Sequence, residues 1–111
     1  MVKPGSGDKK LPVMISGQEL RELKRFTWMM SEAFGLDRRI ENYQGKRPIG
    51  LYSWDLECLL AVLYDATKRK EEYPDKDAPG FTDIVDLFKR LSYEYQREFG
   101  AIAYGYKEDR V

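Results

Sequence analysis

The chain contains no histidine and only one cysteine among its 111 residues. A single cysteine cannot form a disulfide within the chain, and without histidine it cannot complete the ligand set of a zinc site. The lack of histidine also excludes the Ser-His-Asp and Cys-His arrangements of nucleophilic catalysis. We therefore predict no catalytic residues, no bound metal and no cofactor, and a protein that is not an enzyme.

A long apolar run and an excess of charge of one sign are missing as well. No stretch approaches the roughly 20 apolar residues of a membrane span. Residues 1–12 carry lysines but no apolar core of the kind found in a signal peptide. The 19 basic and 19 acidic residues give a formal net charge of zero, which disfavours a polyanion as the main partner. These features predict a cytoplasmic protein with no membrane segment.

The apolar residues that are present suffice for one domain. They make up 42% of the chain, and a chain of this length buries enough surface to fold without a disulfide or a metal. Composition divides the sequence into three parts. We predict a flexible, disordered tail over 1–12, a helical domain over 13–100, and a C-terminal extension over 101–111.

Apolar residues recur at helical spacing in the first part of the domain. Ser16 and Glu19 stand three residues apart, as in a capping box, and the apolar stripe that follows continues to Phe34. Gly35 then supplies the residue type that commonly ends a helix. The pattern predicts one long helix from Ser16 to Phe34.

In the rest of the domain, the sequence predicts a short helix that begins at Asp37 and stops at Gly45. An extended segment around Pro48 follows it. Two further long helices are predicted, over 53–72 and over 82–99, the latter capped by Thr82 and ended by Gly100.

The predicted fold is therefore all-α, a small bundle of three long helices plus one short helix. The helix over 53–72 is apolar on more than one side, so we predict that it is the central one. Its Cys58 lies among leucines, where we expect a raised thiol pKa and the behaviour of a small hydrophobic residue.

The most informative side chain of the first helix is Trp28, which a turn of 100° per residue places nearly opposite the apolar stripe. Its neighbours on that face include Arg21 and Arg25. Tryptophan beside arginine on a charged face is typical of an interface hot spot. The alternative is that the linker, the tail or a cation–π contact with a lysine covers the ring. Tyr93 is placed similarly, but tyrosine is commonly half exposed without a partner.

The C-terminal extension alternates small and bulky residues, with Ile102, Tyr104 and Tyr106 as the bulky ones. A period of two is typical of a strand, although a frayed tail is the alternative. A strand at this place could pair with the exposed edge of a partner. We therefore assign these three residues, with Trp28 and its arginines, to a predicted partner-binding surface.

The most basic stretch places Arg38, Arg39, Lys46 and Arg47 on either side of Tyr43. Arginines beside an aromatic ring can hold phosphates while the ring stacks on a base. The alternative, charges that are solvated or paired elsewhere, is favoured because a nucleic-acid-binding domain is normally basic overall.

On these grounds the sequence predicts a non-enzymatic protein-interaction module, a small subunit or adaptor. A heterologous protein partner is favoured over self-association, which would use the near-heptad seam of the last helix around Leu91. Nucleic-acid binding through residues 38–47 is the alternative function.

Overall fold

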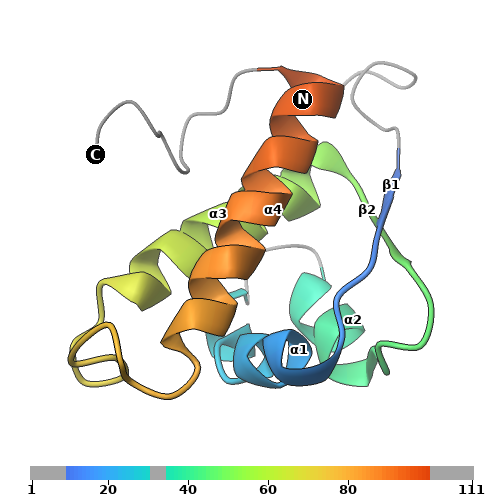
Figure 1. The fold of residues 1–111 in the computed structure, drawn as a ribbon. Helices are drawn as coiled ribbons and strands as arrows, with labels where there is room; N and C mark the ends of the chain where they lie inside the picture. The colour runs from blue at the N-terminus through green and yellow to red at the C-terminus, as the bar shows by residue number, and fades with distance from the viewer. Residues whose placement is uncertain (1–9, 31–34, 101–111) are drawn as a thin grey trace.

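The computed structural model describes residues 10–30 and 35–100, shown as a ribbon in Figure 1. The fold is mostly helical, which confirms the predicted class, and a two-stranded sheet adds to it. In chain order the elements are strand β1 (Leu11–Val13), helix α1 (Gly17–Lys24), the 3-10 helix η1 (Thr27–Met30), helix α2 (Leu36–Asn42), strand β2 (Ile49–Leu51), helix α3 (Ser53–Thr67) and helix α4 (Phe81–Phe99).

Helices α3 and α4 form an antiparallel pair. The rings of Tyr64 and Phe88 lie 6.1 Å apart, centroid to centroid, near one end of the pair, and Tyr95 donates a 2.5 Å hydrogen bond to Glu57 near the other. Figure 1 shows α4 crossing in front of α3. Burial of apolar side chains stabilises this pairing, and α3 contributes a row of buried leucines: Leu56, Leu59, Leu60 and Leu63.

The single long helix predicted over 16–34 is wrong, because α1 ends at Lys24. The chain then tightens into η1, where the backbone N–H of Met29 donates to the carbonyl three residues earlier at 3.0 Å. The hydroxyl of Thr27 lies 2.9 Å from the carboxylate of Glu41 on α2. This side-chain contact anchors the tighter turn against α2, which sequence periodicity alone does not reveal.

Helix α1 begins where predicted, with Ser16 as its N-cap, but the predicted capping box is absent because the Ser16 side chain makes no capping hydrogen bond. Glu19 instead pairs with Arg90 of α4, with 2.8 Å between Oε1 and Nη2. The N-cap of α4 is Gly80, two residues before the predicted cap Thr82. Glu19 therefore joins two helices rather than closing the first turn of its own.

The remaining predicted helices are present. Helix α2 lies where the short helix was expected, α3 ends at Thr67 rather than near residue 72, and α4 ends before Gly100 as predicted. Among the described helices only α3 and α4 are long. The predicted bundle of three long helices is therefore not confirmed.

Leu11 and Pro12, which composition assigned to the flexible tail, belong to β1. This strand pairs with β2 so that Leu11 is opposite Leu51 and Val13 is opposite Ile49. Leu11, Val13 and Leu51 are buried, so apolar burial supports the pairing. Residues 11 and 12 are therefore part of the folded domain rather than of the predicted tail.

Helix α1 packs against α4 and helix α2 packs against η1, while β1 and β2 run along one side of the molecule (Figure 1). Residues 1–9 of the predicted tail and the predicted extension over 101–111 lie outside the described residues. Within the part of the chain that the structure describes, no helix is long and apolar enough to cross a membrane.

Candidate functional site

Trp28 lies in η1, and its side chain is 62% exposed while Thr27 and Met30 of the same turn are buried. The guanidinium carbon of Arg69, just beyond α3, lies 5.2 Å from the centroid of the indole ring. An arginine in this position supports the ring through a cation–π interaction. Trp28 is exposed as predicted, although it lies in a 3-10 helix rather than in a long α-helix. The cation beside its ring is Arg69, which is 41 residues away in the sequence, rather than a lysine.

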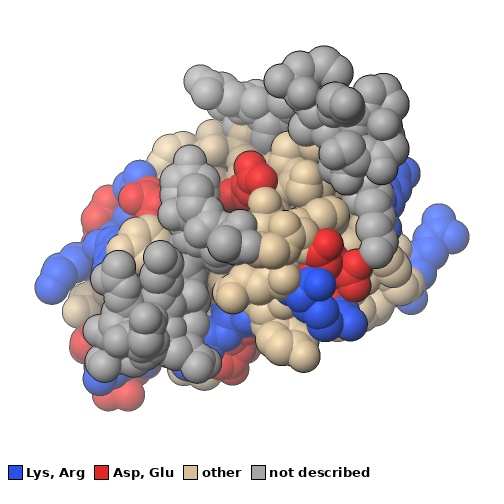
Figure 2. Space-filling model, turned by 90° about the horizontal axis from the view of Figure 1, so that it is seen from above, with Lys and Arg blue, Asp and Glu red and all other residues tan. Residues whose placement is uncertain are grey.

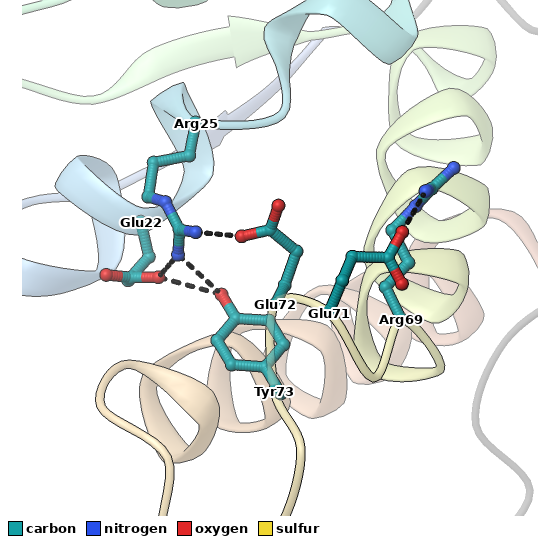
Figure 3. Close-up of polar contacts among 6 residues, drawn as sticks. All are labelled: Glu22, Arg25, Arg69, Glu71, Glu72 and Tyr73. Atoms are coloured by element: carbon teal, nitrogen blue, oxygen red, sulfur yellow. Dashed lines mark hydrogen bonds and ion pairs between the residues drawn. The ribbon is translucent and has the colours of Figure 1, made fainter.

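Two carboxylates hold Arg69 in place. Its Nε lies 3.2 Å from Oδ2 of Asp65, one turn earlier on α3, and its Nη1 lies 3.3 Å from Oε2 of Glu71 (Figure 3). The carbonyl of Arg69 also accepts backbone hydrogen bonds from Glu72 and Tyr73 at 3.0 and 2.9 Å. The turn over 69–73 therefore fixes the cation on which Trp28 rests.

The same turn holds Arg25, at the C-terminal end of α1. The Arg25 guanidinium donates to Glu22 Oε1 at 2.7 Å, to the Tyr73 hydroxyl at 3.4 Å and to the carboxylate of Glu72 (Figure 3). It also lies over the rings of Phe26 and Tyr73. The hydrogen bond to Glu22 is the main reason that the pKa of Arg25 is raised. Arg25 thus links α1 to the segment after α3.

Glu22 is the buried carboxylate of this group. It accepts a 2.7 Å hydrogen bond from the Tyr73 hydroxyl in addition to the one from Arg25. Burial, followed by the bond to Glu22, raises the pKa of Tyr73 well above its usual range. The phenol therefore stays protonated and remains a hydrogen-bond donor over the whole ordinary pH range.

Together these contacts define one surface, which we name the Trp28 face: Trp28, Arg25, Arg69, Glu71 and Glu72. The exposed indole contacts Arg69, and the charged side chains of this set are paired, Arg25 with Glu72 and Arg69 with Glu71. An aromatic ring surrounded by polar groups has the composition of an interface core with its rim. Such a surface can bind a partner by desolvating the ring.

The predicted partner-binding residues separate in the structure. Arg25 and Trp28 belong to the Trp28 face, whereas Arg21 is exposed on α1 and has no hydrogen-bond or ion-pair partner among the described residues. Ile102, Tyr104 and Tyr106 lie outside the described residues.

In the basic segment over 38–47, two side chains bond within the fold and three are exposed. Arg39 Nη2 lies 2.6 Å from Oδ1 of Asp55, a fully buried carboxylate that also accepts the backbone N–H of Tyr52 at 3.0 Å. The hydroxyl of Tyr43 donates to the carbonyl of Arg47 at 2.5 Å. Arg39 therefore links α2 to the start of α3, and Tyr43 bonds within the loop over 43–47.

The other basic side chains of that segment, Arg38, Lys46 and Arg47, are exposed. In the view of Figure 2, Lys and Arg groups lie beside Asp and Glu groups, and neither sign covers the described part of that face. The mixture agrees with the zero net charge of the chain.

Sequence reasoning missed Arg69 and the Glu22–Tyr73 contact. Trp28 on η1 lies 41 residues before Arg69, and Glu22 on α1 lies 51 residues before Tyr73. No local spacing carries that information. The raised pKa expected for the Cys58 thiol is confirmed, and its main cause is burial.

Comparisons with known proteins add no relative: no family model, no curated protein and no solved structure matches the chain. Among the described residues, no group of three or more His, Cys, Asp or Glu side chains is placed to hold a metal ion.

Proposed function

We propose that the chain is a non-enzymatic protein-interaction module, a small subunit or adaptor that docks to another protein through the Trp28 face. The observation that carries the proposal is an indole that is 62% exposed and nevertheless supported by Arg69. Tryptophan is the residue type most enriched in interface hot spots. A ring whose support is already fixed loses less conformational entropy on binding than a free one.

The charges around Trp28 favour a folded protein as the partner. Arg25 is paired with Glu22 and Glu72, and Arg69 with Asp65 and Glu71, so the rim carries both signs. A polyanion such as nucleic acid requires uncompensated cations. A rim of paired charges matches the polar rim of a protein interface instead.

Nucleic-acid binding through 38–47 has less support. Two of its five residues, Arg39 and Tyr43, have partners within the fold, so the ring and one of the four cations have other roles. The cytoplasmic location and the docking of the extension through Ile102, Tyr104 and Tyr106 stay part of the proposal on the sequence pattern alone.

A comparison of the parent chain with two test variants and one control variant tests the proposal. Tagged parent chain, Trp28→Ala, and a chain truncated after Gly100 are used to capture proteins from the native cell. The matched control is Tyr93→Ala, because Tyr93 is also exposed (64%) and also lies beside an arginine, with Arg97 5.9 Å from its ring. We expect Trp28→Ala to lose proteins that the parent and Tyr93→Ala both retain.

Loss of the same proteins on truncation would assign the extension to the docking surface as well. If Trp28→Ala and the truncated chain both fold and recover the parent's proteins at the parent's yield, neither feature is the docking surface and the proposal is wrong. A far-UV circular dichroism spectrum of each variant establishes that it is folded.

A further inference from the structure

The residue after β1 is a methionine whose apolar side chain is exposed. Side chains alternate between core and solvent along 11–15, so Val13 and Ile15 are buried whereas Met14 between them is 42% exposed. The backbone at this position is fixed, because the carbonyl oxygen of Met14 accepts a 2.9 Å hydrogen bond from Nη2 of Arg90 on α4. The Met14 side chain therefore stays on the solvent side of the fold.

The other methionines among the described residues are less accessible. Met29 is half-buried against the core, and Met30 is fully buried. Oxidation converts a thioether to the more polar sulfoxide, which disrupts a core when the side chain is buried. At Met14 the polar product stays in contact with water. Of the described methionines, Met14 is thus the one that a dissolved oxidant reaches first, and the one whose oxidation the fold tolerates best.

A hydroxyl group lies beside the Met14 sulfur. Oη of Tyr43 is 3.8 Å from Sδ of Met14, and it also accepts the backbone N–H of Ile15 at 3.4 Å. The hydroxyl has a single proton, which it donates to the carbonyl of Arg47 at 2.5 Å because a thioether is only a weak acceptor. An oxygen atom added to the sulfur on the side of Tyr43 would be a much stronger acceptor for that proton.

We propose that Met14 is a site of reversible oxidation by hydroperoxides, and that the Tyr43 hydroxyl binds the oxygen of the resulting sulfoxide. With hydrogen peroxide, the sulfur lone pair attacks one oxygen, so the S–O bond forms as the O–O bond breaks. The proton of the transferred oxygen passes to the departing one, which leaves as water. The sulfur loses two electrons and the peroxide gains them. Methionine sulfoxide reductases reverse the change.

Oxidation of Met14 then acts on the loop over 43–47. In the reduced chain, the hydroxyl of Tyr43 closes this loop through the carbonyl of Arg47. When the proton is donated to the sulfoxide instead, the loop loses that bond and opens more often, together with its exposed Lys46 and Arg47. The Trp28 face contributes no residue to this device, so its failure and the failure of the proposed function are distinguishable.

The order of oxidation tests the site. The full-length chain is treated with hydrogen peroxide, and the sulfoxide at each described methionine is followed over time by fragment-ion mass spectrometry of its peptides. We expect Met14 to react at least about tenfold faster than Met30, which requires an opening of the core. The control is the same chain in denaturant, where the methionines should react at similar rates. Equal rates at Met14 and Met30 in the folded chain would overturn the proposal.

Cleavage of the loop tests the role of Tyr43. Trypsin cuts after Lys46 but not after Arg47, because Pro48 follows, so brief digestion of the folded chain at that bond reports how often the loop opens. The oxidised parent should be cut there at least about twofold faster than the reduced parent, and treatment with a sulfoxide reductase should restore the slower rate.

Two variants control this measurement. Met14→Leu carries no sulfur at the site, so peroxide should leave its cleavage rate unchanged. Tyr43→Phe lacks the bond to Arg47 in both states, so it should be cut quickly with or without peroxide. An oxidised parent that is cut at the rate of the reduced parent, or a Met14→Leu variant that responds to peroxide as the parent does, would contradict the proposal.

Discussion

Gly80 and the carboxylate of Glu22 lie so close that a Cβ atom added to Gly80 would be 2.3 Å from Glu22 Cδ. Gly80 also has φ of +86°, a backbone conformation that costs other residues energy. Glycine is therefore required at the N-cap of α4 for two separate reasons. The buried Glu22 in turn holds Arg25 and Tyr73, so the start of α4 and the Trp28 face share one polar group.

The two reasons are separable by comparing Gly80 with Gly35. Gly35 is the N-cap of α2 and has the same φ of +86°, but no atom of the described residues lies within 4 Å of an added Cβ there. Both Gly→Ala variants should lose stability from the backbone conformation, and Gly80→Ala should lose at least about 1 kcal/mol more because Glu22 must move. Urea unfolding measures both, and equal losses would show that Glu22 yields freely.

Arg39 and Arg38 are neighbours on α2 with different roles. Arg39→Ala leaves the buried Asp55 carboxylate without its cation and should cost about 1–3 kcal/mol of unfolding free energy. Arg38→Ala removes an exposed side chain and should change stability by less than about 0.5 kcal/mol. Chemical denaturation of both variants checks this difference, and a destabilised Arg38→Ala would show that Arg38 also supports the fold.

The sequence predicted the features that depend on neighbouring residues. The stop at Gly100 and the short helix before Gly45 follow from glycine and helix-capping preferences. The buried leucines of α3 follow from a wide apolar surface. Pairings between distant residues left no such signal: Arg90 lies 71 residues from Glu19, and β1 pairs with a strand nearly 40 residues later.

The candidate site was predictable to the same degree. The exposure of Trp28 followed from its charged neighbours, although the helical angle used to argue it belongs to a helix that ends before that residue. The contact between Arg69 and Trp28 could not be predicted, because the turn over 69–73 is close to η1 in the folded chain but distant from it in the sequence. For Arg39, pairing elsewhere was favoured over a phosphate site, but nothing local indicates that its partner is Asp55.

The Tyr95 hydroxyl makes the free energy of unfolding depend on pH in the alkaline range. Burial, followed by its hydrogen bond to Glu57, raises the pKa of Tyr95 to about 12. The unfolded chain releases this proton near pH 10, so the folded state holds more protons between about pH 10 and 12, and stability falls as pH rises through that window. Below pH 10 this contribution is fully present. Tyr95→Phe should therefore lose less stability than the parent as the pH rises from about 10 to about 12, measured by urea unfolding. An identical loss in the two proteins would contradict this role.

Leu63 tests the packing of α3. It is fully buried, so Leu63→Ala should cost about 2–5 kcal/mol, the range for a leucine whose removal leaves a cavity. Leu60→Ala should fall in the same range, since Leu60 is also buried. Thermal unfolding reports both. An unchanged melting temperature in either variant would mean that α3 lies at the edge of the core.

The affinity of a captured partner for the chain tests docking through Trp28 most directly. Isothermal titration calorimetry of that partner is carried out with the parent, Trp28→Ala and Tyr93→Ala, each shown to be folded. A hot-spot tryptophan contributes at least about 2 kcal/mol, so Trp28→Ala should weaken binding by about 30-fold or more. Tyr93→Ala, which removes an equally exposed ring from α4, should bind like the parent. A Trp28→Ala variant that binds the partner with the parent's affinity would contradict the account.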